Sequence, residues 1–172
     1  IITTVKSRTV WLGANLFTAF IASAVINIFE DTLEKVIALA VLMPIVASMG
    51  GVAGSQTLTL VIRSMAQGHI VESNPRWLRM REVGVGVANG LIWSGVVAIA
   101  AAAMFHDTTL GLIIALALII NLISASLAGA TIPMTLKRFG IDPAIAGTVI
   151  LTTVTDVVGF VSFLGLATIF YA

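Results

Sequence analysis

Long apolar stretches dominate the chain, and five of them are long enough to cross a membrane as helices. A bilayer core of about 30 Å requires roughly 20 apolar residues in helical form. The pattern predicts transmembrane helices over residues 10–29, 36–66, 83–105, 110–136 and 144–171. The second stretch exceeds a straight crossing and contains Pro44, so we expect that helix to be kinked or tilted. The stretches lack the ten-residue alternation of barrel strands, so the predicted fold class is an all-α integral membrane protein.

The composition excludes the main alternatives to a membrane protein. Apolar residues make up 59% of the 172 residues and charged residues only 10%, whereas about 25% of a soluble domain is charged. So few charges cannot solvate the surface of a soluble domain, and a mean hydropathy of +1.11 is the opposite of a disordered chain. The net charge of +1 gives no field for nucleic acid. The absence of cysteine excludes disulfides and thiolate metal sites.

The distribution of basic residues predicts the orientation in the membrane, because cytoplasmic loops carry an excess of Lys and Arg. Eight of the nine basic residues fall on the side that contains the N-terminus, and only Lys35 falls on the other. The eight are Lys6, Arg8, Arg63, Arg76, Arg79, Arg81, Lys137 and Arg138. We therefore expect a cytoplasmic N-terminus and, because the number of helices is odd, an external C-terminus.

Asp156 is, by these ranges, the only ionisable side chain deep in a predicted helix. It follows Ala144 by 12 residues, about 18 Å along a helix that rises 1.5 Å per residue. That depth is close to the bilayer centre, where a carboxylate costs at least about 2.5–3.5 kcal/mol. No lysine or arginine lies deep in the predicted helices to neutralise it. We interpret Asp156 as a cation or proton site; the alternative is a structural aspartic acid that only packs.

The residues around Asp156 favour a hard cation. Thr152 and Thr148 lie four and eight residues before it and Gly159 three residues after it, so all three are expected on its helix face. Hydroxyl, carboxylate and bare backbone oxygens are the ligands that Mg²⁺ and Ca²⁺ prefer. One carboxylate per chain is little for a dication, whereas a two-fold homodimer places two on opposite sides of one axis.

Glycine and asparagine residues in the predicted helices have a packing interpretation and a functional one. Gly50/Gly54 and Gly86/Gly90 form GxxxG pairs, which let helices approach closely. The functional alternative is that glycine leaves backbone carbonyl groups exposed to a pore. For the asparagines in or near the helices we expect hydrogen bonds between helices; they are Asn15, Asn27, Asn89 and Asn121.

Enzyme motifs are missing from the sequence. There is no H-E-x-x-H zinc motif, and the glycine-rich segments 50–55 and 84–90 match neither a phosphate-binding loop nor a dinucleotide-binding turn. An aspartyl protease in the membrane would need a second carboxylate beside Asp156. The sequence therefore predicts a membrane protein that is not an enzyme.

Two sequence blocks resemble the transmembrane region of the MgtE family of magnesium channels. They are PIVASMGGVAGSQTLTLVIRSMAQGHI, residues 44–70, and GATIPMTLKRFGIDPAIAGTVILTTVTDVVG, residues 129–159. The resemblance implies a homodimer in a bacterial inner membrane, with a Mg²⁺ pore on the two-fold axis and the fifth helices lining it. It implies that Asp156 binds the ion and that Thr152 contributes a backbone carbonyl group nearby.

Further expectations follow from the same resemblance. We predict that the pore is lined by Gly50, Gly51, Val52, Gly54, Thr148 and Gly159. Where the family usually has Asn after the paired glycines this chain has Val52, and where it usually has Pro before the threonine pair it has Val149. These departures leave selectivity among Mg²⁺, Co²⁺ and Mn²⁺ open. The chain starts with Ile1, and we expect upstream an N-terminal domain and a pair of CBS domains that regulate transport.

The sequence leaves three functions in competition. The first is a Mg²⁺-selective channel that passes a largely hydrated ion between two copies of Asp156, because Mg²⁺ sheds water reluctantly. The second is an ion-coupled secondary transporter of divalent cations, in which Asp156 binds the coupling ion. The third is a non-conducting membrane anchor for soluble domains, surrounded by lipid.

Overall fold

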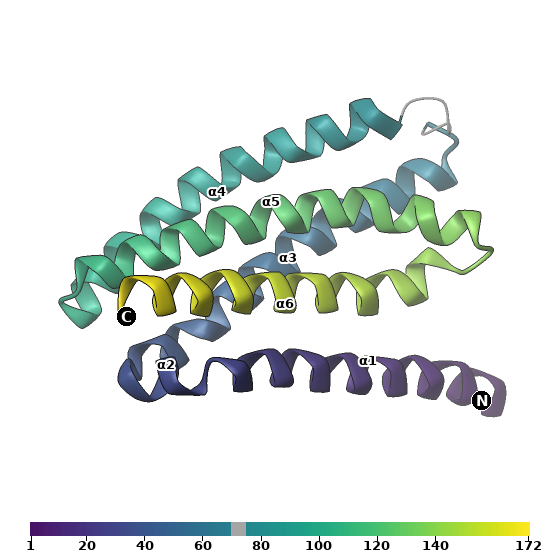
Figure 1. Ribbon diagram of the computed structural model, residues 1–172. Coiled ribbons are helices and arrows are strands. Elements are labelled where there is room, and N and C mark those ends of the chain that lie inside the picture. Colours follow the sequence, from purple (N-terminus) through teal and green to yellow (C-terminus); the bar gives the residue numbers. More distant parts are fainter. Residues whose placement is uncertain (70–74) are drawn as a thin grey trace.

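In the computed structural model, which describes residues 1–69 and 75–172, every regular element is an α-helix (Figure 1). The helices are α1 (Ile2–Ile28), α2 (Glu30–Lys35), α3 (Ala38–Ala66), α4 (Pro75–Phe105), α5 (Thr108–Arg138) and α6 (Pro143–Phe170). All except α2 are long and apolar enough to cross a membrane. The predicted fold class and the five spanning helices are confirmed for the described residues.

Several helices extend beyond the apolar ranges predicted from the sequence. α1 begins at Ile2 instead of residue 10, and α4 begins at Pro75 instead of residue 83. Both extensions carry basic residues, which are good helix formers but add no apolar signal. The short helix α2, which the apolar pattern does not predict, contains the acidic residues Glu30, Asp31 and Glu34. Hydropathy therefore predicts the part of a helix inside the membrane and not its ends.

α3 continues through Pro44 as one helix and crosses α5 and α6 obliquely (Figure 1). This inclined path agrees with the expected tilt of a stretch longer than a straight crossing.

α5 is the central helix of the bundle, because it packs against α3, α4 and α6. Its side chains at Ile113, Ile114, Ala117 and Leu118 are fully buried. A helix that is apolar all round and buried on several sides belongs in the core of a bundle. α5 thereby sets the positions of α3 and α6, which also pack against each other.

α1 lies at the edge of the bundle and packs mainly against α6 (Figure 1). Ala22 is its one buried residue, and Val25, Ile26 and Phe29 join the same core cluster at the end of the helix. The first half of α1 is covered by no other described helix, although its composition is that of a membrane span.

The ends of α5 and α6 are held by capping interactions. Asp107 accepts hydrogen bonds from the backbone N–H groups of Thr109 (2.9 Å) and Leu110 (3.2 Å), which caps the start of α5. The hydroxyl group of Tyr171, just after α6, donates a hydrogen bond to the other oxygen of the Asp107 carboxylate. This hydrogen bond lowers the pKa of Asp107, and burial together with Asp107 raises the pKa of Tyr171. The end of α6 is thus tied to the start of α5.

Candidate ion site

Asp156 lies near the middle of α6 and is half-buried. Within the described part of the chain, no side chain donates a hydrogen bond to its carboxylate and no basic group lies within ion-pairing distance. A carboxylate at this depth without a partner in its own chain points to a function.

Thr148 and Thr152 continue the face of Asp156 toward the start of α6, as predicted. The Thr148 side chain is exposed and that of Thr152 is half-buried. The Thr152 hydroxyl group donates to the Thr148 carbonyl oxygen at 2.7 Å, and the Thr152 carbonyl oxygen accepts from the Thr155 hydroxyl group at 3.1 Å. The hydroxyl hydrogens are therefore used within the helix, and the hydroxyl oxygens keep acceptor capacity on the open face.

Gly159 does not lie on that open face, so its expected place beside Asp156 is wrong. It is buried, and a Cβ atom there would come within 2.8 Å of Asn121 Nδ2 and 3.2 Å of Val46 Cγ1. The three-residue step from Asp156 rotates the position toward α3 and α5, and the absence of a side chain is explained by packing.

The GxxxG pairs have the packing role expected of them. A Cβ atom on Gly50 would lie 2.3 Å from Asn121 Nδ2, and one on Gly54 would lie 2.7 Å from Leu151 Cδ1. Gly86 and Gly90 approach the α5 backbone in the same way, at 3.0 and 3.3 Å. Close packing of α3 and α4 on the rest of the bundle is thus confirmed, while pore lining by Gly50 and Gly54 stays a prediction.

The outer face of α3 is polar and uncovered by the rest of the described chain. Gly51 and Val52 lie in a shallow depression of this face together with Ser55, Gln56 and Thr59. Polar groups at membrane depth need a partner or water. The sequence analysis recognised Gly51 and Val52 and missed the three polar side chains, whose three- and four-residue spacing would have indicated one helix face.

Glu82 is a second carboxylate inside a spanning helix, so the prediction that Asp156 stands alone is wrong. Its side chain is only 9% exposed, and one of its oxygens accepts a hydrogen bond from the Thr57 hydroxyl group at 3.1 Å. It lines a cavity of about 150 Å³ between α3, α4 and α5, next to Asn89 and Ser126. The apolar pattern missed Glu82 because the basic residues before it hide the true start of α4.

Asn121 of α5 makes the hydrogen bond between helices that the sequence predicts. It is fully buried, and its Nδ2 donates to the Val46 carbonyl oxygen of α3 at 2.9 Å. Its Oδ1 has no partner among the described residues. The same expectation is wrong for Asn15, Asn27 and Asn89, whose side chains are exposed.

The described residues contain no group of three or more His, Asp or Glu side chains able to hold a metal ion together. One chain therefore offers a single deep, open carboxylate at Asp156, one flanking row of hydroxyl oxygens, and a polar face on the neighbouring helix α3. This arrangement suits weak binding of a hydrated hard cation and not tight coordination of a dehydrated one.

Comparison with known proteins identifies relatives over nearly the whole chain. The model of the MgtE family, described as divalent cation transporter, matches residues 43–166. The magnesium transporter MgtE of Bacillus subtilis is 34% identical over 163 residues, which cover 95% of this chain and 36% of the relative. The magnesium transporters MgtE of Thermus thermophilus and Enterococcus faecalis are 32% and 28% identical, over 94% and 96% of this chain. The chain spans about a third of the length of these relatives.

Proposed function

The chain belongs to the MgtE family of divalent cation transporters, and on that premise we propose that the protein carries Mg²⁺ across a cell membrane. The open carboxylate of Asp156, near the middle of a spanning helix, is the observation that carries this proposal. Such a group is too costly to retain in a bilayer as mere packing. The names of the relatives supply the identity of the ion.

The transporting unit is a homodimer with α6 of each chain at the two-fold axis. A two-fold axis turns one Asp156 into a pair, and two carboxylates balance the charge of one dication. The open polar face of α3, with Gly51, Val52 and Gln56, lies beside α6 and would line the same passage. A partner copy or water would satisfy these polar groups.

The ion passes largely hydrated. Mg²⁺ keeps most of its water shell and is usually held by one or two carboxylates. At about 4–5 Å through one water, each carboxylate attracts the ion by a few kcal/mol at an effective dielectric constant near 20. Acceptor oxygens of Thr148 and Thr152 add hydrogen bonds to the bound water. Binding of this strength holds the ion and still releases it, as conduction requires.

The N-terminus lies in the cytoplasm and the C-terminus outside, so transport of Mg²⁺ into the cell follows the membrane potential. This orientation rests on the excess of basic residues at the ends of α3, α4 and α5. The soluble regulatory domains expected upstream belong to the same proposal, and the length of the relatives is consistent with additional domains.

Uptake of Mg²⁺ into liposomes that contain the purified protein tests the transport proposal, and protein-free liposomes are the control. Saturable uptake driven by an inside-negative potential is expected, and no uptake above the control would contradict it. Single-channel currents in planar bilayers separate a channel from the coupled carrier, because a carrier gives flux without unitary currents. Unitary Mg²⁺ currents are expected.

A further inference from the structure

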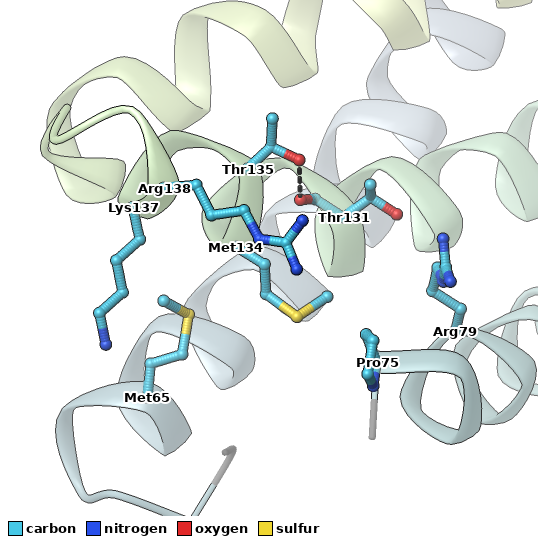
Figure 2. Close-up of a pocket in the computed structure, with 8 residues that line it drawn as sticks. All are labelled: Met65, Pro75, Arg79, Thr131, Met134, Thr135, Lys137 and Arg138. Carbon is cyan, nitrogen blue, oxygen red and sulfur yellow. Dashed lines mark hydrogen bonds between the residues drawn. The ribbon is translucent and has the colours of Figure 1, made fainter. Parts of the chain in front are cut away.

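A basic pocket lies at the end of the bundle where α3 and α5 finish and α4 begins (Figure 2). It is separate from the ion site on α6 and has a volume of about 150 Å³. It is lined by Met65 of α3, by Pro75 and Arg79 of α4, and by Thr131, Met134, Thr135, Lys137 and Arg138 of α5. The proposed function uses none of these residues.

Positive charge is the main property of the basic pocket. Arg79, Lys137 and Arg138 line it, and no carboxylate is among the residues that do. Figure 2 shows Arg138 reaching from α5 across Met134, with Arg79 on the α4 side. The nearest acid along α4, Glu82, bonds to Thr57 instead. Two guanidinium groups around one small space form a site for a phosphate group, which arginine binds through paired N–H groups.

The inner wall of the basic pocket is apolar. Met65 and Met134 pack against the small core cluster of Val61, Leu78 and Ala130. The Thr135 hydroxyl group donates to the Thr131 carbonyl oxygen at 3.0 Å, beside the arginines. A ligand that carries a phosphate group next to apolar chains would contact both parts of this pocket, whereas inorganic phosphate would use only the basic part.

The basic pocket opens at the level where the helices leave the membrane. The spanning helix α5 ends at Arg138 and α4 begins at Pro75. Nearby, the exposed Trp77 side chain carries the Arg81 guanidinium 5.5 Å from its ring centre, and tryptophan and arginine are typical of the headgroup region. In the proposed orientation this is the cytoplasmic leaflet, which is rich in anionic lipids.

We propose that the basic pocket binds the phosphate group of an anionic phospholipid of the cytoplasmic leaflet, with Arg79 and Arg138 as the principal contacts. Basic pockets between spanning helices on this side of a membrane are suited to lipid headgroups. Lipid held there would join the ends of α3, α4 and α5, and α3 and α5 both pack against α6.

Native mass spectrometry of the purified protein in detergent, titrated with phosphatidylglycerol or phosphatidylcholine, tests this proposal. The wild-type protein should retain phosphatidylglycerol at least tenfold more tightly than phosphatidylcholine. The variant R79Q/R138Q should lose about tenfold to thirtyfold of that affinity. The matched control R63Q/R76Q removes the same charge from exposed side chains at the same end that do not line the pocket, and should lose less than threefold.

Three results would overturn the proposal. Equal losses in the two double variants would mean that charge alone attracts lipid to this end of the bundle. Displacement of phosphatidylglycerol by millimolar inorganic phosphate would make a free anion the occupant. Unchanged lipid retention in R79Q/R138Q would leave the pocket to an acidic protein segment. The exposed single variant R138Q, expected to lose threefold to tenfold, guards against misfolding of the double variant. Mg²⁺ uptake in phosphatidylcholine vesicles, measured in parallel, reports on the transport proposal independently.

Discussion

At the scale of single residues, the glycines of α5 and α3 determine how closely these helices approach. A Cβ atom on Gly129 would lie 2.6 Å from the Gly54 carbonyl oxygen and 2.9 Å from Thr57 Cβ. The first of these contacts is with backbone, which cannot rotate away as a side chain can. A methyl group at this position must therefore push the two helices apart.

The variant G129A should be less stable than the wild-type protein by about 1–3 kcal/mol, because overpacking outweighs the helix propensity of alanine. Gly95 on α4 is the matched control, since nothing lies within 4 Å of the Cβ position there. G95A should be neutral or more stable by up to about 1 kcal/mol. Thermal unfolding in detergent measures both, and equal melting temperatures for the two variants would contradict the described packing.

The same scale explains which site residues can be predicted from sequence. Asp156 is recognisable because an acid in a long apolar stretch has no bland explanation. Asn121 and Gly159 are not, because their roles depend on the meeting of α3, α5 and α6, which lie far apart in the sequence. Glu82 escapes because a carboxylate after three arginines resembles an ordinary loop charge.

At the scale of elements, the outer ends of α5 and α6 are joined through Asp107 and Tyr171. The pKa of Asp107 is lowered, so its contribution to stability is present above the ordinary aspartate pKa near 4 and is lost as pH falls through the lowered value. The pKa of Tyr171 is raised, so its contribution is present below pH 10 and is lost as pH rises through the raised value.

The variant Y171F should therefore be less stable by about 1 kcal/mol between roughly pH 5 and 9, with a smaller difference outside that window. Thermal unfolding across this pH range measures the difference. Because Tyr171 is the one tyrosine of the chain, ultraviolet absorbance follows its ionisation directly. Tyrosinate that forms near pH 10 in the folded protein would show that the hydrogen bond to Asp107 is absent.

The elements themselves were predictable in number and type but not in extent. Five apolar stretches give five spanning helices because a bilayer selects for length and apolarity. The beginnings of α1 and α4, and the whole of α2, lie outside the apolar core, where a helix can continue through polar residues without any hydropathy signal. Helix ends in such a protein follow from capping and packing, as Asp107 and Asp142 illustrate at α5 and α6.

At the scale of the whole molecule, the proposed dimer places the open face of α6 at the two-fold axis. The chain contains no cysteine, so single cysteines can be introduced without background. T148C, on the face of Asp156, should crosslink between chains in membranes. I150C, which is also exposed but points away from that face, should not. Crosslinking at residue 150 and not at residue 148 would place a different face of α6 at the dimer interface.

The account depends most on the charge of Asp156. The variant D156N keeps the size of the side chain and removes two negative charges from the dimer, each of which attracts the ion by a few kcal/mol at an effective dielectric constant near 20. Since about 1.4 kcal/mol corresponds to a factor of ten, Mg²⁺ occupancy should fall by orders of magnitude. Packing should change little, because an uncharged amide is easier to bury than an unpaired carboxylate.

The most direct test is Mg²⁺ uptake by D156N in liposomes, with thermal unfolding measured on the same preparation. D31N is the matched control, because Asp31 is an exposed carboxylate on α2, outside the spanning helices. The account predicts that D156N folds with near wild-type stability and loses at least nine-tenths of its uptake, while D31N transports normally. Wild-type uptake by a well-folded D156N protein would contradict the assignment of Asp156 as the ion site.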